Sequence, residues 1–357
     1  MTVTDVTRTD RIEDNPVLAQ DWRGRAPLPM SADSAFNGYI AANVLFALNR
    51  LGVLAEFESA GFVDVSAFCA EHSVDEPMFR SFVHAARSFG HVSVDGDKVT
   101  LTEAGREVVR MHGFFTWAVG GYNEVFANAG PLALGERTYS HDVLRDEGMV
   151  ALGSAQCDRE LMAHILDGVL AEVDFSVLAD LGSGTSARVS RVVAGRPGAR
   201  GLGLDISGPA TEIAHRTIAA AGMADRVSAI QADVLDVVLA QEHREAIAEV
   251  DAVMSFFLLH DLLANPATRG DILPRMREVF PKARTFLLAD TVIRPRHDDD
   301  ATLPVFSTGF ELAHALMGVP LHTKEAYEQL FAEAGLHLRR AVPFGAPHSW
   351  LFVLEAR

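Results

Sequence analysis

The segment "FFLLHD", residues 256–261, places a histidine beside a carboxylate directly after a run of apolar residues. Such a run is typical of the end of a buried strand, and ligands of α/β proteins bind at the carboxyl ends of parallel strands. His260 could act there as a general base, as a metal ligand or as a packed structural residue. The position favours a functional role for His260, while Asp261 either orients it, relays a proton or caps the next helix.

A glycine-containing loop follows an earlier predicted strand. The segment "VLADLGSGTSARVSRVV" places Gly182 and Gly184 after a strand and before a helix, where the backbone can approach a ligand closely. A dinucleotide-binding loop would carry a third glycine at position 187, which is Ala187 here, a permitted but weaker variant. Asp180, just before the loop, is better explained by another ligand, and an amino acid that carries a sulfonium would fit.

Two further acids end the next two predicted strands. Asp205, in "GLGLDIS", follows the glycine loop by about 20 residues, where a carboxylate can accept hydrogen bonds from both ribose hydroxyls. Asp233, in "IQADVLD", could accept a hydrogen bond from an adenine amino group. An acid at one strand end is often only a helix cap, but the repetition on successive strands favours a common ligand.

The surrounding pattern predicts the elements that position these residues. From about residue 174, short apolar strands alternate with helical segments, which predicts a parallel sheet with helices on both faces and a terminal antiparallel hairpin. Earlier, three helices precede "HVSVDGDKVTLT", a hairpin pattern around Asp95-Gly96, and this order suggests a winged-helix module. We therefore expect an arm at residues 1–30, a winged-helix domain at 31–110, a helical linker to the pocket at 111–173 and an α/β domain at 174–357.

Composition limits the function. The 357-residue chain is long enough for two domains, and its formal net charge of −17 makes nucleic acid an unlikely partner, so the ligands should be small molecules. No apolar run approaches the roughly 20 residues of a membrane span, and the polar start lacks a secretory pattern, so we expect a cytoplasmic protein without membrane contact. The cysteines, Cys69 and Cys157, lack metal-site spacing, so any metal would be bound by His, Asp or Glu.

The glycine loop and the three acids resemble the binding set of the class I S-adenosylmethionine-dependent methyltransferases. With the preceding helical module, the chain from about residue 36 onward resembles the small-molecule O-methyltransferases. This resemblance implies S-adenosylmethionine as cofactor, dimerisation through the helical module, and a base at the end of the fourth strand, where this chain has His260 and Asp261. The binding set that it implies comprises Asp180, Gly182, Gly184, Asp205 and Asp233.

His314 departs from the pattern of that family. It lies on a predicted apolar helix one turn after Glu311, in a region where the O-methyltransferases tend to supply a carboxylate that orients the base. His260 and His314 could bind one metal ion between them, with iron expected first and zinc or nickel as alternatives. Otherwise His314 only packs within its helix. Glu311 could be a third ligand, a partner that supports the ligands or a helix-facing acid, and we favour the supporting role.

This departure resembles a narrower branch of the family, the metal-dependent C-methyltransferases that methylate the β-carbon of α-keto acids in natural-product precursor supply. A metal acting as Lewis acid on the keto oxygen would stabilise the enolate that accepts the methyl group. The leading prediction is therefore C-methylation of a phenylpyruvate-like or branched-chain α-keto acid. The alternatives are O-methylation of a phenol or other hydroxyl with His260 as base, a winged-helix regulator and a nicotinamide oxidoreductase.

Several further residues fit a pocket for such a substrate. Arg145 could bind a substrate carboxylate through its guanidinium, with Arg137 as a rival, and both could equally be solvated surface residues. Trp117 could form a wall of the pocket or pack in the core. The other residues that we expect to line the pocket are Phe257, Phe310, Glu311 and Met317.

Overall fold

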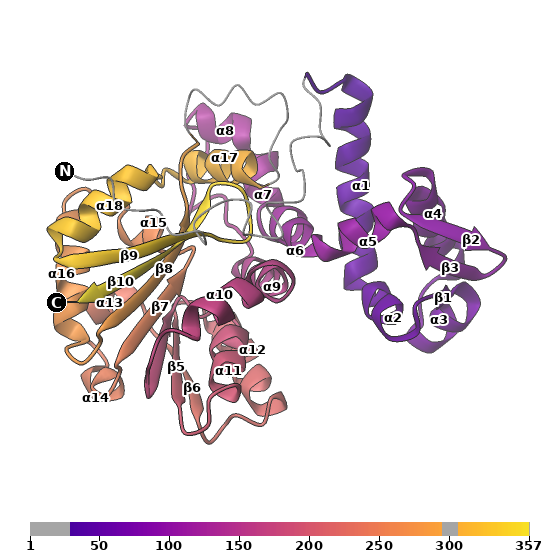
Figure 1. Cartoon of the computed structure of the whole chain (residues 1–357). Coiled ribbons are helices and arrows are strands. Elements are labelled where there is room, and N and C mark those ends of the chain that lie inside the picture. Colours follow the sequence, from indigo (N-terminus) through magenta and orange to yellow (C-terminus); the bar gives the residue numbers. More distant parts are fainter. Residues whose placement is uncertain (1–28, 295–305, 357) are drawn as a thin grey trace.

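A computed structural model describes residues 29–294 and 306–356 of the chain (Figure 1). A seven-stranded sheet forms its larger part, in the strand order β6-β5-β4-β7-β8-β10-β9. The strands are β4 (Val177–Leu181), β5 (Arg200–Asp205), β6 (Val227–Gln231), β7 (Ala252–Phe256), β8 (Thr285–Thr291), β9 (Leu336–Pro343) and β10 (Ser349–Ala356). The expected arm at residues 1–30 lies outside the described residues except for its last two.

The predicted α/β architecture is confirmed. Strands β4 to β8 pair in parallel, whereas β10 runs antiparallel to both β8 and β9. Strands β9 and β10 thus form the predicted antiparallel hairpin at the end of the chain. All five residues of the central strand β7 are buried, because helices cover both faces of the sheet. The acids and glycines at the carboxyl ends of β4, β5 and β7 consequently lie close together, where they can share a ligand.

Two apolar cores lie on opposite faces of the sheet. Successive strand residues alternate between them: Leu178 packs in one core and Ala179 in the other. The first core includes residues of α10 (Ala163–Leu170), α11 (Ala187–Ala194) and α12 (Gly208–Ala220). The second includes residues of α13 (Val234–Leu239), α14 (Arg244–Ile247), α15 (Leu259–Leu262), α16 (Arg269–Val279) and α18 (Lys324–Glu333).

The N-terminal part forms its own core. The helices are α1 (Ala32–Arg50), α2 (Val53–Ala60), α3 (Val65–His72) and α4 (Glu76–Ser88), and the strands are β1 (Val63–Asp64), β2 (Val92–Asp95) and β3 (Lys98–Leu101). Strands β2 and β3 pair antiparallel on either side of Gly96, which has a φ of +58°, so the predicted hairpin is confirmed. The winged-helix description and the domain boundaries stay predictions.

Short helices connect this part to the sheet. They are α5 (Glu103–Arg110), α6 (His112–Phe115), the π-helix η4 (Thr116–Gly121), α7 (Asn123–Ala127), α8 (Ala129–Ala133), α9 (Glu147–Cys157) and the π-helix η5 (Asp158–Met162). Helix α17 (Ser307–Met317) lies beside α7 and α8 (Figure 1). Among the described residues no single helix is long and apolar enough to span a membrane, although α1 and α2, bent by 69°, meet that requirement as a pair.

Candidate active site

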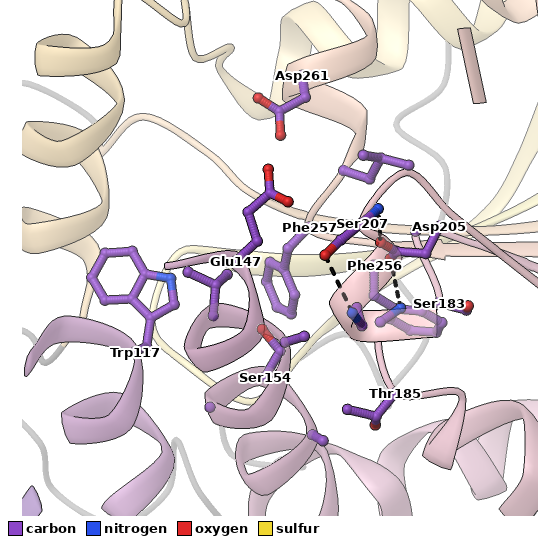
Figure 2. A pocket seen from close by; sticks show the side chains of 18 of the residues that line it. Trp117, Glu147, Ser154, Ser183, Thr185, Asp205, Ser207, Phe256, Phe257 and Asp261 are labelled. Carbon is purple, nitrogen blue, oxygen red and sulfur yellow. Dashed lines mark hydrogen bonds between the residues drawn. The ribbon is translucent and has the colours of Figure 1, made fainter. Parts of the chain in front are cut away.

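A cavity of about 360 Å³ lies at the carboxyl ends of β4, β5 and β7 and is closed by η4, α9 and α17 (Figure 2). Most of the residues predicted from the sequence line it. These are Trp117, Arg145, Gly182, Gly184, Asp205, Asp233, Phe257, His260, Asp261, Phe310 and His314. The topology of the sheet therefore brings together residues that are up to about 200 positions apart in the chain.

The glycine loop forms one end of the cavity. Gly182 has a φ of +71° and Gly184 a φ of +53°, a region of backbone conformation that side chains with a Cβ rarely adopt. A Cβ on Gly182 would also lie 3.0 Å from Cδ2 of Leu258. The Gly184 N–H donates a hydrogen bond of 2.7 Å to Asp205, so the loop and the acid that ends β5 hold each other in place.

The three acids of this region have different environments. Asp205 also accepts from the Ser207 N–H at 2.9 Å (Figure 2), and burial raises the pKa of its carboxyl. Asp233 lines the cavity and also caps α13, because it accepts a hydrogen bond from the Leu235 N–H. It therefore has a structural role whether or not it binds a ligand. Asp180, predicted to bind the cofactor, is fully buried and does not line the cavity, and neither of its carboxylate oxygens has a hydrogen-bond partner among the described residues. Burial, opposed by Arg188, raises the pKa of Asp180 to about 7.

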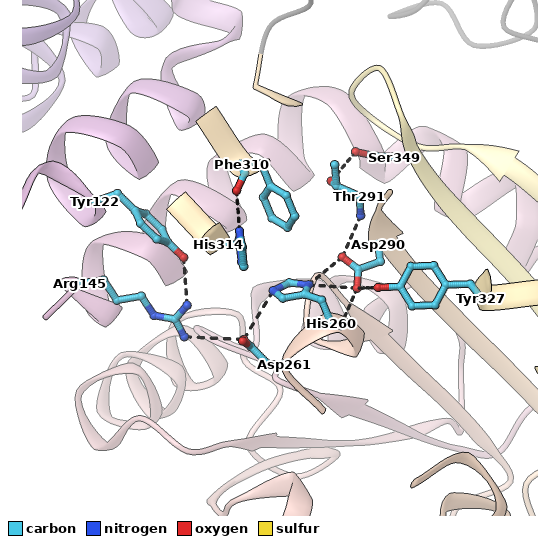
Figure 3. Close-up of polar contacts among 10 residues, drawn as sticks. All are labelled: Tyr122, Arg145, His260, Asp261, Asp290, Thr291, Phe310, His314, Tyr327 and Ser349. Atoms are coloured by element: carbon cyan, nitrogen blue, oxygen red, sulfur yellow. Dashed lines mark hydrogen bonds and ion pairs between the residues drawn. The ribbon is translucent and has the colours of Figure 1, made fainter. Parts of the chain in front are cut away.

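His260 forms a buried pair with a residue that the sequence analysis missed. Its Nδ1 lies 2.9 Å and 3.0 Å from the two carboxylate oxygens of Asp290, and its backbone N–H donates to the same carboxylate at 2.8 Å (Figure 3). His260 is 2% exposed and Asp290 is fully buried. Asp290 is the penultimate residue of β8, in "FLLADT", and follows the same pattern of an apolar run and then an acid as Asp180 and Asp205. That pattern marks Asp290 as an acid near a strand end but does not show that it pairs with His260.

The Asp290 carboxylate fixes the state of the His260 ring. A carboxylate accepts hydrogen bonds, so Nδ1 carries a proton, and Nε2 has a lone pair in the neutral form of the ring. Burial lowers the pKa of His260, but the charges of Asp290 and Asp261 outweigh this effect and raise it above its usual value. Burial conversely raises the pKa of Asp290, and the neighbouring His260 outweighs it, so that this carboxyl is held below its usual range.

The backbone at the end of β7 is strained. Phe257 has a φ of +56°, which is unusual for a bulky residue, and its N–H donates to the Ala289 carbonyl at 2.8 Å. This turn ends the strand and starts the short helix α15, which places His260 against the carboxylate of Asp290. Backbone strain of this kind is typical of functional sites.

His314 lies directly beside His260. The two ring centroids are 4.4 Å apart and the rings are nearly perpendicular, at 87°. Its Nδ1 donates to the Phe310 carbonyl at 2.7 Å, which leaves a lone pair on Nε2, and this buried atom has no partner within the described ranges. Burial, together with the charge of His260, lowers the pKa of His314 to about 3, so the ring is neutral.

Arg145 completes the polar wall beside the two histidines. Its Nη1 donates to the Tyr122 hydroxyl at 3.0 Å, and its Nη2 lies 3.9 Å from Asp261 (Figure 3). Nε of Arg145 has no partner in the part of the chain that the structure describes. The rival Arg137 binds Asn128 at an exposed position instead. Of the two arginines, therefore, it is Arg145 that faces the cavity.

Two residues expected in the pocket lie outside its lining. Glu311 pairs with Arg294, whose Nε lies 2.9 Å from the carboxylate. Sequence proximity to His314 suggested a supporting role, but the carboxylate that orients a histidine here comes from β8. Met317 packs in the apolar cluster that surrounds Trp117 and Phe310 rather than against the cavity, because it lies near the end of α17.

The two histidines form only part of a metal site. The two Nε2 lone pairs are suitable ligands. However, residues 29–294 and 306–356 contain no group of three or more His, Cys, Asp or Glu side chains that could hold a metal. The predicted metal ion is thus not supported by a complete protein site.

Curated relatives of the chain are methyltransferases. No family model matches the sequence. Methyltransferase ungE' of Aspergillus campestris is 28% identical over 318 residues, which cover 87% of this chain and 91% of the relative. Phenazine O-methyltransferase PhzM of Lysobacter antibioticus is 27% identical over 197 residues, 55% of this chain and 52% of that protein.

Solved structures share the fold. Mitomycin 7-O-methyltransferase MmcR matches with a TM-score of 0.62 and 18% identity, over 91% of this chain and 96% of its own. Human N-acetylserotonin methyltransferase in complex with SAM matches with a TM-score of 0.64, 18% identity and the same coverage. The protein is an S-adenosylmethionine-dependent methyltransferase with the fold of the class I O-methyltransferases.

Proposed function

We propose that the protein transfers the methyl group of S-adenosylmethionine to a hydroxyl oxygen of a small, largely apolar acceptor. The observation that carries this proposal is the buried pair of His260 and Asp290 in the wall of the cavity, where Nε2 of His260 lies 3.6 Å from the Asp261 carboxylate (Figure 3). The named relatives favour oxygen methylation over the C-methylation that the sequence analysis placed first. The activity expected as the alternative therefore becomes the main proposal.

The residues around the glycine loop fit S-adenosylmethionine, which supplies an electrophilic methyl group when bound. Asp180 lies beneath the loop and outside the lining of the cavity, so its buried carboxylate has no direct contact with the cofactor in this proposal. Gly182 and Gly184 let the backbone approach the ligand. Asp205 would accept hydrogen bonds from the ribose hydroxyls, and Asp233 from the adenine amino group.

His260 acts as general base in this proposal. Its neutral Nε2 takes the proton of the acceptor hydroxyl while the oxygen forms its bond to the methyl carbon. The imidazolium that results is stabilised by Asp290, 2.9 Å from Nδ1. Because methyl transfer is an in-line displacement, the remaining contribution of the protein is to hold the two reactants in position.

The walls of the cavity indicate the acceptor. Trp117 and Phe310 stack with ring centroids 6.4 Å apart, and Phe310 also contacts His260. An aromatic or other apolar body can pack against such side chains. Arg145 supplies a partly buried cation whose Nε has no partner among the described residues, so we expect an acceptor that carries a carboxylate or another oxygen anion near its hydroxyl.

One observation favours a second candidate function. His314 is neutral, and once His260 is deprotonated the adjacent imidazoles offer two lone pairs, an arrangement that binds a divalent metal such as iron, zinc or nickel. An α-keto acid could complete that site with its keto oxygen and carboxylate. Such a metal would supply Lewis acidity for methylation of the β-carbon, and Arg145 would then bind the substrate carboxylate.

The two candidates are separated by one set of assays. Purified protein is incubated with methyl-labelled S-adenosylmethionine and a panel of phenols, catechols and α-keto acids such as phenylpyruvate. Oxygen methylation by His260 predicts labelled ethers, insensitivity to EDTA and loss of activity in His260→Gln. The metal mechanism predicts carbon-methylated keto acid, about one metal ion per chain, and loss of both in His314→Ala.

A homodimer is also part of the proposal. Helix α1 exposes Phe36 and Tyr39, at 68% and 62% of their surface. Exposed aromatic side chains on one helix support an interface between two chains. Sedimentation of the purified protein tests this proposal, and a monomer at micromolar concentration would contradict it.

A further inference from the structure

The buried network behind His260 extends beyond Asp290 to α18. The Tyr327 hydroxyl donates a hydrogen bond of 2.9 Å to Oδ2 of Asp290 (Figure 3). Tyr327 is fully buried, and its ring packs edge-on against His322, with centroids 5.3 Å apart, and parallel to Phe331. Tyr327 does not line the cavity, so any effect on the reaction passes through Asp290.

The Asp290 carboxylate has a definite set of donors. Oδ1 accepts from the Thr291 N–H at 2.8 Å, and Oδ2 accepts from both the His260 N–H and the Tyr327 hydroxyl. Burial raises the pKa of the Tyr327 phenol well above its usual value of 10, so the hydroxyl keeps its proton and always donates. A buried carboxylate needs such donors to remain charged.

We propose that Tyr327 is a positioning residue, which sets the orientation and the basicity of His260 through Asp290. The two backbone donors restrain the carboxylate from one side, and the phenol holds Oδ2 from the side of α18, so that both oxygens stay within 3.0 Å of Nδ1. This inference rests on the proposed role of His260 as base.

The sign of the effect follows from the charges. A phenol that donates to Asp290 draws off part of the negative charge that stabilises the imidazolium of His260. Removal of the hydroxyl therefore raises the pKa of His260 further. The other titratable and charged groups that face the pair are Asp261, Arg145, His314 and His322, and none of them is altered by a change at Tyr327.

The test is Tyr327→Phe in the full-length protein, with Ser88→Ala on the exposed face of α4 as a control that also removes one hydroxyl. Imidazole NMR titration reports the pKa of His260 without any acceptor, and the signal is assigned by its loss in His260→Gln. We expect an upward shift of about half a pH unit in Tyr327→Phe and none in the control. With an acceptor from the panel above, kcat should fall about tenfold while KM is unchanged.

A second comparison asks whether Tyr327 acts through Asp290. In an Asp290→Asn background the additional change Tyr327→Phe should have no further effect on kcat, because the two residues act as one unit. Additive losses would overturn the inference. So would an unchanged His260 titration in a folded Tyr327→Phe protein, whereas full methyl transfer by His260→Gln would instead overturn the proposed function.

Should Tyr327→Phe fail to fold, the reverse perturbation replaces it. Incorporation of 3-fluorotyrosine makes the phenol a stronger donor. A background with Tyr122→Phe and Tyr139→Phe leaves Tyr327 as the fluorinated tyrosine beside the site. The pKa of His260 should then fall relative to the unfluorinated protein. An unchanged pKa would contradict the role assigned to Tyr327.

Discussion

Replacement of Asp290 by Asn tests the pair that orients the proposed base. The substitution keeps the size of the side chain but removes the charge 2.9 Å from Nδ1 of His260. At an effective dielectric constant of about 20, a unit charge pair at this distance contributes roughly 6 kcal/mol. In the transition state the imidazole is only partly protonated, so about half of this electrostatic energy stabilises it. Without the charge of Asp290, kcat should therefore fall by about 10² to 10³.

The change also alters the pH dependence. Asp290 is among the groups that raise the pKa of His260, so the acid limb of kcat/KM should move to lower pH in Asp290→Asn. An amide can also donate to Nδ1, which would place the ring proton on Nε2 and remove its lone pair.

The assay is the formation of S-adenosylhomocysteine with an accepted phenol or catechol, beside calorimetric binding of S-adenosylmethionine. Binding should be unchanged, because Asp290 does not line the cavity. Asp251→Asn is the matched control: this carboxylate also accepts backbone N–H groups, those of Ser176 and Val177, but at the other end of the sheet. A folded Asp290→Asn protein with kcat within about threefold of wild type would refute the reasoning.

Further predictions concern pH, stability and the cofactor. The wild-type kcat/KM should rise with pH through a pKa above 6.5, since only neutral His260 accepts a proton; a profile flat between pH 5 and 8 would contradict this. The pKa of His314 is lowered to about 3 in the folded protein, so below about pH 6.5 the unfolded chain binds a proton that the folded protein does not. The free energy of unfolding should therefore fall as the pH falls, and denaturant titration should show a smaller fall in His314→Gln. Glu311→Gln should leave kcat within about twofold, because Glu311 pairs with Arg294 outside the cavity. Gly182→Ala should weaken S-adenosylmethionine binding at least tenfold by calorimetry, because its Cβ would meet Leu258 in a backbone conformation that alanine disfavours.

The sequence identified those site residues whose neighbours in the chain explain them. Gly182, Gly184 and Asp205 follow short apolar strands, and parallel pairing brings the ends of such strands together. The same reasoning predicted the parallel sheet and the antiparallel terminal hairpin. His260 and His314 were expected to meet because their elements flank one pocket, and the structure places their rings 4.4 Å apart.

The partners of these residues could not be predicted in the same way. Asp290 and Glu311 are both acids that precede or follow apolar segments, and only the pairing of β7 with β8 places Asp290 behind His260. Glu311 was favoured because it lies one turn from His314, yet Arg294, 17 positions earlier, binds it instead. The Tyr327 hydroxyl likewise reaches Asp290 only through the packing of α18.

The central claim is tested most directly by the position of the transferred methyl group. Wild-type protein and His260→Gln are incubated with ¹³C-methyl S-adenosylmethionine and each accepted phenol or keto acid, and the product is examined by NMR. The account predicts a methyl group on oxygen in the wild-type product, and no product from His260→Gln although it still binds the cofactor. A methyl group on carbon, or an unchanged rate in His260→Gln, would contradict it.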